Sequence, residues 1–186
     1  MMELIAFEKY EGAGNDFIIL DFFHNEAIDL EDNEFMRRLC DRHFGIGADG
    51  IMALCPEEGL DFRMKYLNSD GNFSTFCGNG SRCISLYAFH KWGRKNFRFI
   101  AADGIHESVI VDNDTVRVKM KDIQTLEKTS NGILVQSGSP HLIFEVEDPL
   151  NYPIRDEGRF IRRAFSAEGA NVNFVEIIND HQIVMA

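Results

Sequence analysis

Short segments that alternate apolar and polar residues dominate this sequence, and they constrain its fold more than any other feature. Residues 115–120, Thr-Val-Arg-Val-Lys-Met, are typical. Successive side chains of a strand point to opposite faces, so this segment has one dry and one wet face. The pattern predicts strands at 4–10, 17–23, 50–55, 61–67, 97–101, 107–111, 115–120, 133–137, 141–146, 172–178 and 182–186.

Helical periodicity is confined to three segments, at residues 33–43, 80–92 and 156–166. The first predicts one apolar face made of Phe35, Met36, Leu39, Cys40 and His43. No long Gly/Ser/Pro linker interrupts the chain, and the polar stretch 121–132 is the best boundary. We therefore predict an α+β fold whose sheets wrap around one or two helices, with one lobe at 1–121 and another at 122–186.

A thiol followed by glycines opens the second of these helices. Residues 76–83 read Phe-Cys-Gly-Asn-Gly-Ser-Arg-Cys, and Cys83, Ile84, Tyr87, Ala88 and Trp92 then form one apolar stripe. Cys77 thus precedes a helix N-terminus, where free N–H groups and the helix dipole should lower its pKa. The same N–H groups can hold a carboxylate. The alternative is a buried structural cysteine at a tight turn.

Amide and hydroxyl side chains beside glycine recur in four separate loops. They read Gly-Ala-Gly-Asn-Asp-Phe at 12–17, Tyr-Leu-Asn-Ser-Asp-Gly at 66–71, Gly-Ser-Pro-His at 138–141, and Gly-Ala-Asn-Val-Asn-Phe at 169–174. An asparagine side chain both donates and accepts hydrogen bonds, so a ring of asparagines suits the zwitterionic head group of an amino acid. Each asparagine taken alone could equally be an ordinary turn residue.

Together these motifs resemble the diaminopimelate epimerase family, whose cofactor-independent enzymes serve bacterial lysine and peptidoglycan-precursor synthesis. The specific matches are Gly14-Asn15-Asp16-Phe17, Asp41-Arg42-His43 with Gly45-Ile46-Gly47, Asn68-Ser69-Asp70-Gly71, and Cys77-Gly78-Asn79-Gly80 with Arg82-Cys83. The resemblance runs from about Phe7 to the last residue. It implies two similar lobes, each a sheet wrapped around a central helix.

The resemblance also implies roles for individual residues. Cys77 would be one of two catalytic cysteines, which interconvert LL- and meso-diaminopimelate by removing and returning the α-proton from opposite faces. Gly78 and Asn79 would hold the α-carboxylate of this diamino diacid. The other substrate-binding positions would be Asn15, Asn68, Ser139 and Asn171. The resemblance further implies no cofactor and a homodimer.

The chain departs from the family pattern at three places. Ser139 stands where the family usually has asparagine, and Gly50 where many members have glutamine. The family's second Cys-Gly-x-Gly loop would fall beyond Ala186, and Cys83 cannot replace it because it faces the core with Tyr87. An apolar strand at 182–186 with no polar tail also suggests a fragment with an incomplete second lobe. We therefore expect this chain alone to be inactive in epimerisation.

Charge and cysteine spacing exclude several other classes of function. A net charge of −11 argues against nucleic acid or anionic membrane as a partner. No segment reaches the roughly 20 apolar residues of a membrane span, and no signal peptide precedes the first strand. Four cysteines without Cys-x-x-Cys spacing suggest reduced thiols in a cytoplasmic protein and no metal site. Two alternatives to an epimerase remain: a non-catalytic domain that binds a diamino diacid, and a thiol redox protein that uses Cys77.

Overall fold

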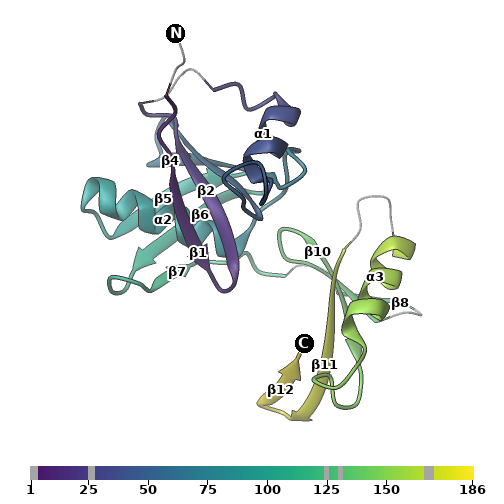
Figure 1. The fold of residues 1–186 in the computed structure, drawn as a ribbon. Coiled ribbons are helices and arrows are strands. Elements are labelled where there is room, and N and C mark those ends of the chain that lie inside the picture. The colour runs from purple at the N-terminus through teal and green to yellow at the C-terminus, as the bar shows by residue number, and fades with distance from the viewer. Residues whose placement is uncertain (1–3, 25–27, 124–125, 130–131, 166–169) are drawn as a thin grey trace. The chain divides into compact units, whose positions relative to one another are not determined.

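The fold is known from a computed structural model, which describes residues 4–24, 28–123, 126–129, 132–165 and 170–186. Contacts divide the chain into two compact units, Met1–Met120 and Lys121–Ala186, here called unit 1 and unit 2. Each unit contains its own sheet (Figure 1). Of the predicted loops, Ser130, Asn131 and Gly169 lie outside the described residues. In the described part of the chain, no helix has the length and apolarity needed to cross a membrane.

Unit 1 is built on a seven-stranded sheet in the order β1-β2-β3-β4-β5-β6-β7. Most neighbours are antiparallel, but β2 pairs with β3, and β4 with β5, in parallel. Helix α2 (Gly78–Trp92) contacts β1, β2, β6 and β7, so the sheet wraps around it. The bounds of the strands are β1 Glu8–Gly12, β2 Asn15–Asp21, β3 Gly50–Cys55, β4 Phe62–Asn68, β5 Asn96–Ala101, β6 Gly104–Ile110 and β7 Val116–Val118.

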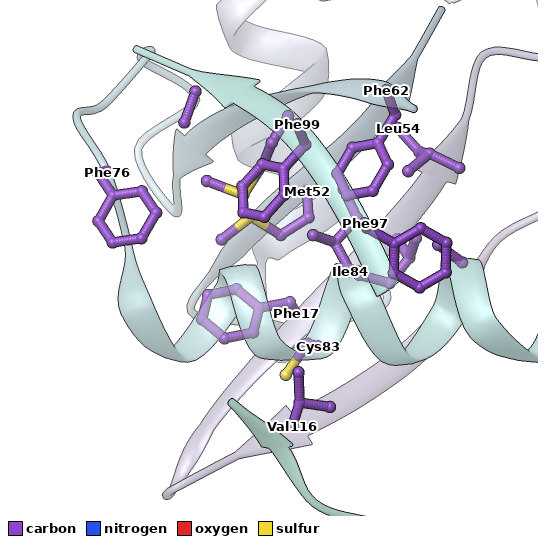
Figure 2. Packing of buried hydrophobic residues seen from close by; sticks show 14 of the residues in the cluster. Phe17, Met52, Leu54, Phe62, Phe76, Cys83, Ile84, Phe97, Phe99 and Val116 are labelled. Atoms are coloured by element: carbon purple, nitrogen blue, oxygen red, sulfur yellow. The ribbon is translucent and has the colours of Figure 1, made fainter. Parts of the chain in front are cut away.

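Two apolar clusters form the core of unit 1. The larger one lies between the sheet and α2 and is rich in aromatic rings, including Phe17, Phe62, Phe97 and Phe99 (Figure 2). The smaller one packs helix α1 (Asn33–Cys40) on the other side chains of β2 and β3, through Met36 and Cys40. Because β2 and β3 supply side chains to both clusters, they read as continuous apolar runs.

Unit 2 is built on a five-stranded sheet in the order β12-β11-β10-β9-β8, with helix α3 (Ile154–Phe165) in contact with β11. Strand β10 pairs in parallel with β11 and the other neighbours are antiparallel. No residue of α3 is buried, although the helix is strongly amphipathic. The bounds are β8 Leu126–Thr129, β9 Gly132–Gln136, β10 Pro140–Glu145, β11 Asn171–Asn179 and β12 Gln182–Met185.

The predicted α+β fold with a sheet around a central helix is confirmed, and several predicted boundaries are wrong. The first strand begins at Glu8 instead of residue 4. Helix α1 ends at Cys40, where Asp41 adopts an extended conformation, so His43 lies outside the helix and is exposed. Strand β8 lies in the polar stretch 121–132, where no strand was predicted. Its side chains are mostly exposed, so the sequence shows no alternation of apolar and polar residues there.

Candidate functional site

Cys77 is the N-cap residue of α2, as the sequence predicts. Its backbone is extended, and its Sγ accepts a hydrogen bond from the Gly80 N–H at 3.4 Å. The first turn of the helix lies directly on the core: a Cβ added at Gly80 would fall 1.7 Å from Cε of Met52. The glycine therefore lets the helix start pack on the sheet without a side chain between them.

The pKa of Cys77 does not follow the prediction. Partial burial of the Cys77 side chain raises its pKa above the ordinary value. The N–H groups of Gly80 and Asn79 and the charge of Arg82 oppose that rise. The predicted lowering considered the helix terminus alone and omitted desolvation. Cys83 is buried in the core and burial raises its pKa to about 11, which agrees with its exclusion as an acid/base.

Asn15 and Asn79 meet at the start of α2. Asn79 Nδ2 donates to Asn15 Oδ1 at 2.6 Å, and Arg82 in turn donates to Asn79 Oδ1. The β1–β2 hairpin brings Asn15 here, and Gly12 of that hairpin approaches so closely that an added Cβ would lie 2.9 Å from Sγ of Cys83. Two residues that are far apart in sequence are thus joined beside Gly78 and Cys77.

An ion-pair network supports Asn15 from the other side. Arg42 donates to both Asp16 carboxylate oxygens, at 2.7 and 3.1 Å, and to Asp49 at 2.8 Å. Asp49 accepts a bond from Asn15 Nδ2 at 3.2 Å. Hydrogen bonds from Arg42, and also from Lys9, hold the pKa of Asp16 well below its ordinary value. The network fixes the amide of Asn15 with its Oδ1 turned toward Asn79.

Asn68 lies at the same end of the sheet. It is the last residue of β4 and pairs with Gly50, which pairs on its other side with Phe17. Within the described residues, its half-buried side-chain amide makes no hydrogen bond, so a ligand could use it. A Cβ at Gly50 would lie 2.5 Å from the Leu67 carbonyl oxygen, so this backbone leaves no room for a side chain at this position.

Ser139 and Asn171 form a second polar cluster, in unit 2. Asn171 Nδ2 donates to Ser139 Oγ at 3.2 Å. His141 pairs with Asn171 across β10 and β11, and Asn173 Nδ2 lies 3.1 Å from His141 Nδ1. Asn173 is not among the predicted site residues, although it stands two residues after Asn171 on the same face of β11. The predicted substrate-binding residues thus fall into two groups, one in each unit.

Comparison with known proteins agrees with these motifs. Residues 7–126 match the family model for diaminopimelate epimerase. The chain is 39% identical over 170 residues to a diaminopimelate epimerase of Flavobacterium psychrophilum, covering 90% of this chain and 66% of that protein. A diaminopimelate epimerase of a Hydrogenobaculum species is 37% identical over 189 residues, covering 90% and 68%. The chain spans about two thirds of the length of these curated relatives.

Solved structures show the same fold at low sequence identity. A phenazine biosynthesis protein of the PhzF family from Bacillus anthracis superposes with a TM-score of 0.64 at 13% identity, covering 99% of this chain and 71% of that one. A hydroxyproline epimerase from Agrobacterium vitis, with bound trans-4-hydroxy-L-proline, gives a TM-score of 0.64 at 11% identity, covering 96% and 68%. These structural similarities establish the fold, and the function has to be argued from the residues of the site.

Proposed function

Because this chain belongs to the diaminopimelate epimerase family, we propose that Cys77 acts as one of two acid/base groups in the epimerisation of a diamino diacid. The reaction interconverts LL- and meso-diaminopimelate and serves lysine and peptidoglycan-precursor synthesis. The observation that carries the proposal is the position of the thiol, at the N-cap of α2 and beside the joined amides of Asn15 and Asn79.

Each residue of the unit 1 site has a distinct task. The N–H groups at the start of α2, at Gly78 and Asn79, receive the α-carboxylate and offset negative charge that develops on the planar intermediate. Asn15 and Asn68 bind the polar head group. The Cys77 thiolate takes the α-proton from one face, and a second acid returns a proton from the other face. By resemblance to the family, we also propose Ser139 and Asn171 as substrate-binding residues, and in unit 2 Asn171 Nδ2 donates to Ser139 Oγ.

The partial burial of Cys77 argues against the alternative of a thiol redox protein. Reactive redox cysteines are exposed and have a low pKa, whereas burial raises the pKa of Cys77. A base with a raised pKa is a stronger base once it is deprotonated, which suits removal of a weakly acidic α-proton. Binding of the α-carboxylate at the helix terminus would also exclude water from the thiol.

The test is exchange of the substrate α-proton in deuterium oxide, followed by NMR with each stereoisomer in turn. We expect the protein to exchange the α-proton of one stereoisomer, and Cys77→Ser to lose this exchange by several orders of magnitude because serine is a far weaker acid. Cys55→Ser, at the end of β3, is the matched control and should retain exchange. Equal exchange in Cys77→Ser would contradict the proposal, and binding without exchange in the parent would favour a binding-only protein.

A further inference from the structure

His106 is a buried histidine at the end of the large core cluster, outside every motif that sequence analysis selected. It lies on β6 opposite Phe99 of β5, and its side chain is only 3% exposed. A polar ring in an aromatic core is costly unless its nitrogens are paired. The partners of this ring therefore show what it holds together.

Both ring nitrogens of His106 face acceptor oxygens. Nε2 lies 2.8 Å from Oδ1 of Asp103, in the turn between β5 and β6, and Nδ1 lies 3.3 Å from the backbone carbonyl oxygen of Lys119. A carbonyl oxygen and a carboxylate oxygen only accept hydrogen bonds, so each ring nitrogen lies beside an acceptor. Two contacts at opposite ends of a planar ring fix its plane as well as its position.

The ring of Phe76 stacks on the face of the His106 ring. The two rings stack with centroids 4.1 Å apart and an angle of 7° between their planes. Phe76 is 5% exposed and directly precedes Cys77, the N-cap of α2. In Figure 2, Phe76 lies on the segment that leads into the helix, at the edge of the cluster that contains Phe99.

The same histidine also bonds the segment that covers the start of the helix. The residue after Lys119 is Met120, whose side chain lies 3.9 Å from the position of a Cβ added at Gly78. His106 thus connects the residue before Cys77 with a segment that packs over the residue after it.

We propose that His106 is a positioning residue for the Cys77 loop, holding Phe76 in place and with it the thiol and the first turn of α2. Only its catalytic consequence rests on the proposed epimerase function, because the position of the thiol is a property of unit 1 alone. Loss of the ring should free Phe76, loosen the N-cap and expose the thiol that burial now shields.

The experiment compares alkylation of Cys77 and Cys55 by iodoacetamide in the intact protein, by peptide mapping across a pH series. Cys55 is half-buried on β3 and serves as the internal reference thiol. We expect His106→Leu to raise the Cys77 to Cys55 rate ratio about tenfold through easier local opening, and to move the midpoint of the Cys77 profile to lower pH. His90→Leu, which removes the bond between His90 and Tyr10 at the other end of α2, is the matched control and should leave the ratio unchanged.

Two further variants separate positioning from general stability. In a Phe76→Leu background, His106→Leu should add nothing to the ratio if its effect passes through Phe76. Asp103→Ala removes the contact with His106 Nε2 and leaves the buried ring itself in place. It keeps the test valid if His106→Leu does not fold, and it should raise the ratio about threefold through the same local opening. An unchanged ratio in variants that are folded by circular dichroism would overturn the proposal, whatever the outcome of the exchange experiment. Absence of exchange in the parent would instead contradict the proposed function and leave this result intact.

Discussion

The two units place polar residues in different ways. In unit 1 the site residues stand on strands and a helix whose inner faces are fully buried, and ion pairs brace them from outside. In unit 2 the cluster of Ser139, His141, Asn171 and Asn173 stands on a sheet with few buried side chains, and α3 buries none. The buried residues of unit 2 among those described are Val135, Leu142, Pro149, Ala170 and Phe174.

This difference separates two sources of positioning. Unit 1 fixes its site through packing, which resists displacement because interiors are close-packed. Unit 2 relies on hydrogen bonds between side chains, each of which contributes about 0.5–1.5 kcal/mol net. We therefore expect the residues around Cys77 in unit 1 to be held rigidly, and the polar cluster within unit 2 to adapt more easily. Four substitutions or substitution pairs test this contrast.

The largest expected effect is a matched pair of isoleucine truncations. Ile84 on α2 is fully buried, whereas Ile183 on β12 is 59% exposed. Ile84→Ala should lower the free energy of unfolding by about 3 kcal/mol through lost burial and a cavity, and Ile183→Ala should change it by less than about 0.5 kcal/mol. Urea unfolding of both variants measures the difference. A similar loss in the two variants would show that the Ile183 face is covered and would remove the contrast.

A smaller effect is expected where α2 begins. Gly80→Ala would bring its Cβ against Met52, which is fully buried, so the first turn of the helix must shift or Met52 must change rotamer. We expect a loss of about 1–2 kcal/mol, since overpacking outweighs the gain in helix propensity. In a Met52→Ala background the obstructing side chain is gone, so Gly80→Ala should no longer destabilise the protein. The double variant should be somewhat more stable than Met52→Ala alone, because the new methyl group fills part of the cavity. If Gly80→Ala is neutral, the helix start is less tightly held than the structure indicates.

The sequence predicted the elements of unit 1 better than their contacts. The predicted stripe on α2 was correct for Cys83, Ile84 and Ala88, which are buried, because periodicity depends only on local spacing. Its other two members, Tyr87 and Trp92, are half-buried, and the pattern missed the buried polar residues Ser81 and Ser85. The contact between Asn15 and Asn79 could not be derived, since it depends on how the β1–β2 hairpin crosses the helix. The predicted lowering of the Cys77 pKa was wrong because the pKa also depends on tertiary packing. Burial of the thiol in the folded chain raises the pKa, and local sequence does not reveal that burial.

Unit 2 was harder to predict. Its strand β8 carries mostly exposed residues and therefore shows no alternation that could reveal it. Helical periodicity predicted a helix at 156–166, close to the observed Ile154–Phe165. The helix is amphipathic, yet none of its residues is buried. Patterns indicate which face of an element is apolar, but they do not indicate what covers that face.

The third prediction concerns the ion pairs that brace Asn15. Because the pKa of Asp16 is lowered in the folded protein, its carboxylate is protonated in the unfolded state at a higher pH than in the folded state. As pH falls through the ordinary value of 3.8, the unfolded state therefore binds this proton before the folded state does. The stabilisation is therefore complete above that pH and is lost as pH falls toward the pKa in the folded protein. Asp16→Asn should make the fall of stability below pH 3.8 shallower, by at most about 1.4 kcal/mol per pH unit for one proton. Asp156→Asn, in the first turn of α3, is the control in unit 2, and equal slopes in all three proteins would contradict the role of the network.

The smallest expected effect compares two residues with left-handed backbone, one in each unit. Ala13 (φ 54°) lies in the β1–β2 turn beside Asn15, and Asp148 (φ 48°) precedes α3. Alanine gains nothing in that conformation, whereas Asp148 accepts a hydrogen bond from Asn151 Nδ2 at 2.7 Å, and aspartate tolerates the left-handed region better. Ala13→Gly should therefore stabilise the protein by about 0.5 kcal/mol, after the entropy cost of glycine in the unfolded chain, and Asp148→Gly should destabilise it by a similar amount. Thermal unfolding of both variants gives the signs. Stabilisation by Asp148→Gly would mean that strain in unit 2 is not offset by its side-chain hydrogen bonds, contrary to the way we infer its polar cluster is held.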